Sequence, residues 1–365
     1  MQQKLRVGVF FGGCSAEHEI SLMSAVNVIN ALDSSKYEII PIGVDRNGKM
    51  FLQHLLMSSQ GKVQGEIKLI PHINNQVVLV PGTGHGLLVN LFTKEKLHAI
   101  DIAFPIMHGS YGEDGTIQGV IKAANVPFVG SDLLSSAICM DKDIAKRLLR
   151  DAGLPIVDFI TLHKHSRDQI EPQQIIKKLG LPCFVKPANL GSSIGVFKVK
   201  DKKDLASAID SAFEYDNKVL IEKYIEGREI ECAVLGNTEL KTSLPGEVIP
   251  KQEFYSYDAK YFDDNGADVV AVADISKELQ SQIQSLAIDA FRCLECQGMA
   301  RVDFFLAKDD EIFINEVNTV PGFTAISQYP KMWEASGLLC PILLDELITL
   351  ALAHFDEQKS LKITP

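Results

Sequence analysis

Residues 301–318 read Arg-Val-Asp-Phe-Phe-Leu-Ala-Lys-Asp-Asp-Glu-Ile-Phe-Ile-Asn-Glu-Val-Asn, with alternating apolar runs on either side of a polar turn. This pattern predicts a β-hairpin. A two-residue turn at Asp309 and Asp310 would determine which residues of the two strands lie opposite one another.

The predicted register places polar side chains of both strands on one face of the hairpin. Asp303 would lie opposite Glu316 and Arg301 opposite Asn318, because side chains two residues apart share a strand face. Two carboxylates and a carboxamide beside a guanidinium suit a hard divalent cation such as Mg²⁺. For the hairpin alone, a solvated face remains the alternative. The other face would point toward a core and carry Val302, Phe304, Phe313 and Val317.

Length and composition indicate an ordinary globular protein. The chain has 365 residues, enough for about two or three domains, with 46% apolar and 23% charged residues. The net charge of −11 disfavours a broad nucleic-acid surface, but it is compatible with a local basic pocket for phosphate. The N-terminal apolar run is too short for a secretory signal, and no apolar run reaches the roughly 18 residues of a membrane span.

The seven cysteines are scattered and odd in number, which favours reduced thiols in a cytosolic protein. Cys293 and Cys296 have the spacing of a zinc or redox pair, but no second pair completes a structural zinc site. Their helical surroundings favour small, buried hydrophobic residues.

The order of the expected elements predicts three regions. Residues 1–138 alternate strands with helices, which predicts a parallel α/β layer. Residues 139–224 predict a small α+β domain, and residues 225–365 a third domain with the hairpin and a tail that frays from Gln358. The expected strands are 5–11, 37–44, 98–105, 126–129, 183–186, 195–199 and 219–222, and the expected helices are 21–32, 116–124, 142–152, 202–213, 277–295 and 341–354.

Two lysines and a glycine-serine loop suggest a phosphate site. The loop 191–195 lets the main chain approach an anion, although it lacks the Gly-Lys-Ser/Thr of a Walker A loop. Lys186 ends an apolar strand and must bury its charge or meet an anion. Lys142 begins a helix, where a cation is unfavourable because it meets the positive end of the helix dipole. An anionic ligand would offset this cost. Taken singly, a common turn and solvated lysines are the alternatives.

Further polar residues stand at the ends of expected strands. Glu222 and Glu229 are candidates for holding the ribose hydroxyls of a nucleotide, with surface acidity equally compatible. Glu17, at the start of a helix, either complements the dipole or binds an ammonium group. His108 lies between a strand and a glycine loop, which favours a site residue over a core histidine.

Nine segments, in a fixed order, cover nearly the whole chain with a common pattern. They are residues 11–21, 108–115, 140–142, 185–187, 190–193, 222–224, 254–261, 301–303 and 315–324. Together they resemble the D-alanine–D-alanine ligase family of bacterial ATP-grasp enzymes. The resemblance implies an N-terminal substrate domain at 1–138, a central ATP-grasp lobe at 139–224 and a C-terminal lobe at 225–365.

The resemblance also implies the reaction and its partners. Two D-alanine molecules would be joined through an acyl phosphate, with ATP and two Mg²⁺ or Mn²⁺ ions, for peptidoglycan precursor synthesis. The enzyme would be a cytoplasmic homodimer that binds neither nucleic acid nor membrane. The alternative is a D-alanine–D-lactate or other D-amino-acid ligase on the same scaffold.

Site residues are implied by position. The metal ligands would be Asp303, Glu316 and Asn318, with Glu316 bridging the ions. Contacts to ATP would come from Lys142, Lys186, Ser192, Ser193, Glu222, Lys223, Tyr224, Ile225, Glu229 and Lys260.

The remaining implied residues contact substrate or assist catalysis. Glu17 would bind the ammonium group of the first D-alanine, and Ser327 and Gly322 would hold the carboxylate of the second. His108 would also contact substrate. Arg301, with the Gly322 N–H, would stabilise the oxyanion. Glu17, Ser192 and Tyr261 would form a hydrogen-bonded triad that closes an aromatic loop over the site.

Some positions depart from the family pattern. The Tyr-Asp-Ala-Lys-Tyr pattern at 257–261 is intact, which favours the dipeptide product. The less usual positions are Ser110, Val320, Ala325, Gln328 and 269–272. Gln328, next to Ser327, leaves the affinity for the second substrate and the pH preference open.

Two other classes of protein compete with a ligase. A non-catalytic nucleotide-binding regulator should have lost a metal ligand or the arginine, yet all four hairpin positions are present. A dinucleotide-dependent oxidoreductase is suggested by Gly12 and Gly13, but the G-x-G-x-x-G spacing is missing.

Overall fold

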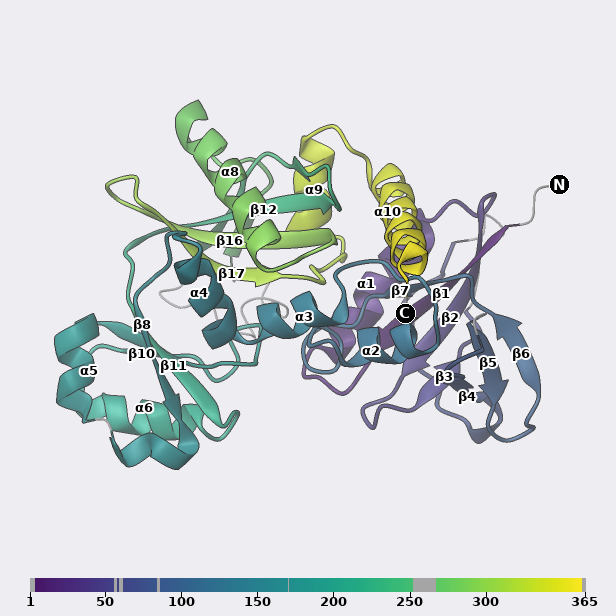
Figure 1. Ribbon diagram of the computed structural model, residues 1–365, viewed down its shortest axis with the longest axis horizontal. Coiled ribbons are helices and arrows are strands. Elements are labelled where there is room, and N and C mark those ends of the chain that lie inside the picture. The colour runs from purple at the N-terminus through teal and green to yellow at the C-terminus, as the bar shows by residue number, and fades with distance from the viewer. Residues whose placement is uncertain are drawn as a thin grey trace.

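Three sheets organise the computed structural model, which describes residues 4–55, 58, 62–83, 86–169, 171–251 and 267–362 (Figure 1). One sheet belongs to the N-terminal region, one to the middle of the chain and one to the C-terminal region. The mixed α/β fold class is confirmed, whereas the three domain boundaries stay a prediction.

The N-terminal sheet has seven strands in the order β6-β5-β4-β3-β2-β1-β7. Its parallel part is as predicted, because β1 pairs in parallel with both β2 and β7. Antiparallel strands, which the sequence did not predict, extend it on the β2 side. Its elements are β1 (Leu5–Gly12), β2 (Tyr37–Val44), β3 (Met50–Leu52), β4 (Gln76–Leu79), β5 (Leu87–Asn90), β6 (Lys96–Ala99), β7 (Ile102–Pro105), α1 (His18–Ala31), η1 (Ile73–Asn75) and α2 (Thr116–Ala123).

Two strand predictions in this region are wrong. The single strand expected at 98–105 is two strands, β6 and β7, that break at Asp101. The Asp101 carboxylate accepts the backbone N–H of Arg6 at 2.8 Å, so a side chain takes the place of a ladder partner there. The strand expected at 126–129 is reduced to a bridge between Ala103 and Phe128.

The middle sheet is antiparallel, in the order β10-β9-β11-β8, and packs against α5 and α6. The expected helix at 202–213 is a 3-10 turn followed by a shorter α-helix, and the expected strand at 195–199 begins at Phe197. The elements of this part are β8 (Phe159–His163), η2 (Lys164–Gln169), α5 (Pro172–Leu179), β9 (Cys183–Pro187), β10 (Phe197–Val199), η3 (Lys202–Asp204), α6 (Leu205–Ala212) and β11 (Lys218–Lys223).

The C-terminal sheet runs β15-β14-β12-β16-β17, and β13 pairs with β12. α10 continues through Ser360, so the fraying expected from Gln358 is wrong there; its last turn is built of good helix formers such as Glu357 and Lys359. The elements are α3 (Leu133–Met140), α4 (Lys142–Asp151), β12 (Gly227–Gly236), β13 (Lys241–Thr242), β14 (Gly246–Pro250), β15 (Ala267–Val270), α8 (Lys277–Cys293), β16 (Gly298–Ala307), β17 (Ile312–Asn318), α9 (Gln328–Ala335) and α10 (Cys340–Ser360).

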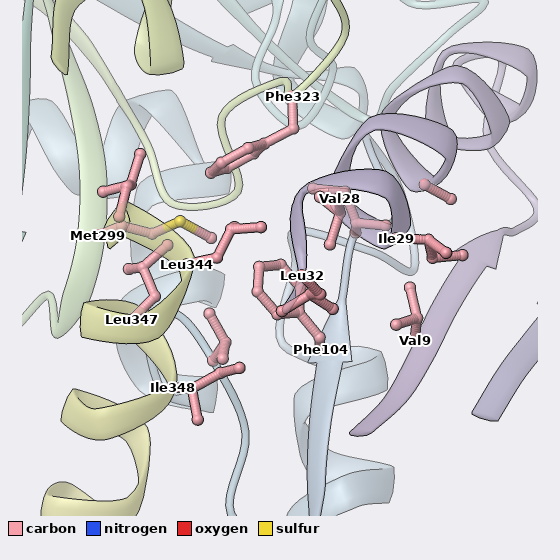
Figure 2. Packing of buried hydrophobic residues seen from close by; sticks show 14 of the residues in the cluster. Val9, Val28, Ile29, Leu32, Phe104, Met299, Phe323, Leu344, Leu347 and Ile348 are labelled. Atoms are coloured by element: carbon pink, nitrogen blue, oxygen red, sulfur yellow. The ribbon is translucent and has the colours of Figure 1, made fainter. Parts of the chain in front are cut away.

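A single apolar cluster joins the N-terminal and C-terminal regions. Leu344 of α10 points toward Phe104 of β7 and Val28 of α1, and Leu347 lies beside Met299 of β16, as Figure 2 shows. Burial of these side chains is the main favourable contribution to folding. The cluster therefore fixes the position of β1 and α1 relative to the hairpin strands.

The hairpin β16-β17 reaches its predicted register by a different route. Its turn has three residues, because Ala307 N–H donates to Glu311 O at 2.9 Å and Asp310 takes a left-handed conformation (φ +63°). A bulge at Asn315 then restores the pairing of Asp303 with Glu316. The predicted two-residue turn is therefore wrong.

The bulge also changes which side chains enter the core. On the turn side of the bulge, Ile314 pairs with Phe304 and both are buried. Phe313, predicted to face the core, is only half-buried. Val302 and Val317 are buried as predicted.

Candidate active site

Glu17 is held at the start of α1 by a loop from the middle of the chain. The Ser192 hydroxyl donates a hydrogen bond to the Glu17 carboxylate. Ser192 and Ser193 both have left-handed backbone (φ +52° and +58°), which folds the glycine-serine loop back toward α1. Gly109 has a left-handed backbone (φ +71°), which favours glycine, and a Cβ there would lie 2.7 Å from Glu17 Oε2 and displace this carboxylate. Two of the three predicted triad members are therefore in contact, and Tyr261 lies outside the described residues.

His108 is buried at the end of β7 with polar partners on both ring nitrogens. Nδ1 lies 3.1 Å from Val320 O and 3.4 Å from Glu113 Oε1, and Nε2 lies 2.9 Å from Ser24 Oγ. Burial acts to lower the pKa of His108, but the hydrogen bond and charge of Glu113 outweigh it and the pKa is raised. His108 lines a cavity as well, so it is both a core residue and a site residue.

The polar face of the hairpin has the predicted pairing, with Asp303 opposite Glu316 and Arg301 opposite Asn318. Arg301 Nε and Nη2 each donate to an Asp303 carboxylate oxygen at 2.7 Å, a bidentate ion pair. Asn318 Nδ2 donates to Asp303 at 2.9 Å. Glu316 lies 3.4 Å from the Lys142 ammonium. The predicted metal ligands thus share one face, and the two carboxylates among them are paired with cations of the protein.

Arg301 is held from a second strand as well. Glu231 on β12 lies 3.3 Å from Arg301 Nε. Burial acts to lower the pKa of Arg301, but the charges of Asp303 and Glu231 outweigh it and raise the pKa. The guanidinium is therefore a permanent cation with a fixed position.

The predicted ATP residues line one cavity of about 430 Å³ between the middle and C-terminal sheets. Every predicted ATP residue that the structure describes lines this cavity: Lys142, Lys186, Ser192, Ser193, Glu222, Lys223, Tyr224, Ile225 and Glu229. Lys260 lies outside the described residues.

The predicted substrate residues line an adjoining cavity of about 150 Å³. Its walls include Glu17, His108, Ser192, Arg301, Gly322 and Ser327. Gly191, Ser192 and Glu316 line both cavities, so the two spaces meet at the glycine-serine loop and the hairpin.

Several charged residues at these cavities were missed from the sequence. Lys198 lies over the Tyr224 ring, 4.1 Å from its centroid, in the larger cavity. Glu113 and Glu231 line the smaller cavity. Glu231 was detectable, because strand alternation places it on the same face as Glu229.

Lys146 of α4 was missed as well. Its buried ammonium group is paired with the carboxylate of Glu222. Lys146 follows Lys142 by four residues, the spacing that puts two side chains on one helix face. That spacing was a usable signal.

Cys296 is buried, with its Sγ 3.7 Å from Cys139 Sγ, which confirms the packing interpretation for this residue. Cys293 is half-buried and packs against the same core.

Among the described helices, none is by itself long and apolar enough to cross a membrane. The consecutive helices α9 and α10, bent by 106°, meet the length and composition requirements only as a pair.

Comparison with known proteins covers both halves of the chain. Residues 6–131 match the family described as D-ala D-ala ligase N-terminus, and residues 148–349 the family described as D-ala D-ala ligase C-terminus. The chain is 49% identical to D-alanine–D-alanine ligase A of Salmonella typhimurium over 364 residues, 99% of each protein.

Solved structures show the same likeness. The D-alanine–D-alanine ligase of Coxiella burnetii has a TM-score of 0.83 and 39% identity, covering 98% of this chain and 96% of that one. The VanG D-Ala:D-Ser ligase of Enterococcus faecalis has a TM-score of 0.83 and 35% identity, covering 96% of this chain and 100% of that one.

Proposed function

The chain belongs to the D-alanine–D-alanine ligase family, and we propose that it joins two D-alanine molecules to D-alanyl-D-alanine while ATP is converted to ADP and phosphate. The observation that carries the proposal is the meeting of two polar cavities at Glu316 and the glycine-serine loop. One cavity has the cations that a triphosphate needs, and the other has an acid and an arginine that suit an amino acid.

ATP would occupy the larger cavity. Lys142 and Lys186 supply two ammonium groups beside the left-handed backbone of Ser192 and Ser193, an arrangement typical of a phosphate cradle. Lys142 is kept there by its hydrogen bond to Leu190 O at 2.7 Å. The terminal phosphate would thus lie at the junction with the smaller cavity.

The oxygen donors of Asp303, Glu316 and Asn318 fit Mg²⁺ or Mn²⁺, which prefer carboxylate and amide oxygens. Among the described residues, no group of three or more His, Cys, Asp or Glu side chains is placed to hold a metal ion, so the site would depend on the Asn318 amide and on phosphate oxygens. When bound, the ions would neutralise the γ-phosphoryl group during its transfer.

The first half-reaction would activate one D-alanine. Glu17 would bind its ammonium group and so direct its carboxylate toward the junction of the cavities. A carboxylate oxygen attacks the γ-phosphorus of ATP, the bond to ADP breaks, and an acyl phosphate forms. Closure of Glu17 and Ser192 over the site would exclude water, which would otherwise hydrolyse the acyl phosphate.

The second half-reaction would form the peptide bond. The amine of the second D-alanine, after loss of a proton, attacks the acyl carbonyl carbon, and phosphate leaves. Arg301 and the Gly322 N–H would stabilise the oxyanion, and Ser327 would hold the carboxylate of the incoming amino acid. The fixed position of Arg301 supports this role, since a preorganised donor needs no rearrangement during reaction.

A ligase with a different second substrate is the alternative. It is favoured by the likeness to a D-Ala:D-Ser ligase and by Gln328, which lines the substrate cavity. A competition of D-alanine against D-lactate and D-serine as second substrate separates these products by mass.

The main test measures phosphate release from ATP with D-alanine, with L-alanine and without amino acid, together with the mass of the product. We expect release that depends on D-alanine and a product of dipeptide mass. ATP turnover that is the same without amino acid would contradict the proposal.

The wider setting is also proposed. We place the enzyme in the cytoplasm as a homodimer that supplies dipeptide for peptidoglycan precursors. Equilibrium sedimentation of the purified chain tests the dimer.

A further inference from the structure

A lysine ammonium group is buried behind the wall of the larger cavity. Lys146 is 1% exposed and belongs to α4, one helical turn after Lys142. It does not line the cavity, whereas Lys142 and Lys186 do. Lysine is almost never fully buried without a partner, so its position needs an explanation.

The partner of this lysine is shared with Lys186. Lys146 Nζ lies 3.1 Å from Glu222 Oε1, and Lys186 Nζ lies 2.6 Å from Glu222 Oε2. All three side chains are less than a tenth exposed. One carboxylate thus stands between two ammonium groups, one behind the cavity wall and one in it.

The contact with Lys146 is electrostatic rather than a well-aligned hydrogen bond. Within the described part of the chain, neither Lys146 Nζ nor Glu222 Oε1 meets the angular requirement for one. Charges this close interact strongly in a buried setting, because little water screens them. Burial acts to raise the pKa of Glu222, but the two lysines outweigh it and lower the pKa, so the carboxylate is ionised.

We propose that Lys146 is a positioning residue that keeps Glu222 neutralised, so that Lys186 is free to turn its ammonium group to the phosphates of ATP. The proposal rests on the proposed nucleotide site. Without Lys146, Glu222 would have Lys186 as its one close cation in the described structure, and a buried carboxylate left unpaired is costly. Lys186 would then stay on Glu222 and be lost to the nucleotide.

The same geometry reassigns Glu222. Both of its carboxylate oxygens face lysines, so its task is to orient the phosphate-binding cation. Glu229, which lines the same cavity as Glu222, remains the candidate for the ribose hydroxyls.

The test compares ATP with AMP, which lacks the β- and γ-phosphates. Dissociation constants are measured by calorimetry with magnesium and without D-alanine, so that no turnover occurs. For Lys146→Met we expect ATP to bind about tenfold more weakly, the loss of roughly one charge-assisted contact, and AMP to stay within about twofold of the native protein. Lys146→Arg should keep both affinities.

A double variant separates positioning from folding. Lys146→Met combined with Glu222→Gln removes both charges, which frees Lys186, so ATP affinity should return to within about threefold of native. Lys203→Met, at a lysine that is 76% exposed in the middle region, is the matched control and should change neither constant. If Lys146→Met does not fold, the double variant is compared directly with the native protein.

Three results would overturn the proposal. The first is unchanged ATP affinity in Lys146→Met, and the second is an equal loss of affinity for ATP and AMP. The third is a double variant that binds ATP no better than Lys146→Met. If Lys146→Met does not fold, the third result is a double variant that binds ATP more than threefold more weakly than the native protein. Failure of the native protein to bind ATP more tightly than AMP would instead contradict the nucleotide site itself, and so the two failures are distinguishable.

Discussion

At the scale of single residues, we expect the hairpin carboxylates to matter for catalysis and little for folding. Glu316 is half-buried, borders both cavities and is paired with Lys142 at 3.4 Å. We expect Glu316→Gln to lower phosphate release by about 10³-fold, because metal charge stabilisation supplies several kcal/mol to such transition states. The melting temperature, followed by circular dichroism, should shift by only a few degrees. Normal phosphate release by the folded variant would refute the metal assignment.

Gly322 is limited by space rather than by backbone conformation. A Cβ at this position would lie 2.7 Å from Ser327 Oγ, so Gly322→Ala must displace that hydroxyl. We expect the KM of the second D-alanine to rise about tenfold, since small displacements in a site cost up to about 10²-fold. Steady-state kinetics at saturating ATP measures it, and Ser327→Ala should act in the same direction. An increase confined to the KM of ATP would count against the assigned role of Ser327.

His108 gives a pH dependence whose sign follows from its partner. Its pKa is raised above the ordinary 6.5 despite burial, because of Glu113. The protonated His108 therefore stabilises the folded protein fully at pH values below 6.5. This stabilisation is lost as the pH rises through the higher pKa that His108 has in the folded protein. We expect melting temperatures of the native protein to fall between pH 6 and pH 9 more steeply than those of His108→Gln. Parallel curves would show that the His108–Glu113 pair does not contribute.

At the scale of elements, α4 delivers Lys142 and Lys146 from a capped N-terminus. The Asp141 carboxylate accepts the N–H groups of Asp143 and Ile144, both at 3.1 Å. Removing such a cap costs about 1 kcal/mol. The same carboxylate also forms an ion pair with Lys218. We therefore expect Asp141→Ala to lower stability by more than that amount, measured by urea unfolding, and to raise the KM of ATP several-fold.

A second helix cap provides the control for this prediction. Ser276 caps α8 by accepting the N–H of Leu279 at 3.2 Å, away from the cavities. Ser276→Ala should cost about 1 kcal/mol, the cap alone, and leave the KM of ATP unchanged. If both variants raise that KM equally, fraying of a helix has no specific link to Lys142.

The hairpin shows how far pattern alone reaches. Asp303 and Glu316 were correctly placed opposite each other because the two errors cancel: the turn has one residue more than predicted, and the bulge at Asn315 takes up one residue on β17. A bulge is decided by packing around Ile314 and Phe304, which local sequence does not encode. Phe313 was misplaced for the same reason.

Other failures have different causes. β3 to β6 are strands of three or four residues, so their alternation is too short to read, although most of them pair with a strand that is near in the chain. Lys146 was overlooked because a lysine on a helix usually points to solvent; only Glu222 on β11 makes its burial tolerable. The residues expected at the two cavities were named from the resemblance of short segments at the ends of elements, and their catalytic roles stay predictions.

At the scale of the whole molecule, the substrate cavity depends on the N-terminal and C-terminal regions staying together. Glu17 and His108 come from the first, Arg301 and Ser327 from the second. One direct polar link is the His108 contact with Val320 O at 3.1 Å. The larger contribution comes from the apolar cluster that contains α10 (Figure 2).

Loosening that cluster should therefore impair both stability and substrate binding. Leu344 is fully buried between α10 and the N-terminal region, and Leu→Ala changes in such positions cost about 2–5 kcal/mol. We expect Leu344→Ala to lower the free energy of unfolding in urea by that amount and to raise the KM of D-alanine more than that of ATP. The reason is that the ATP cavity lies within the middle and C-terminal sheets, whereas the D-alanine cavity needs Glu17. Leu361→Ala, at a leucine that is 59% exposed, is the control and should alter neither quantity. Equal increases in the two KM values would mean that α10 supports the enzyme as a whole and has no particular part in aligning the substrate cavity.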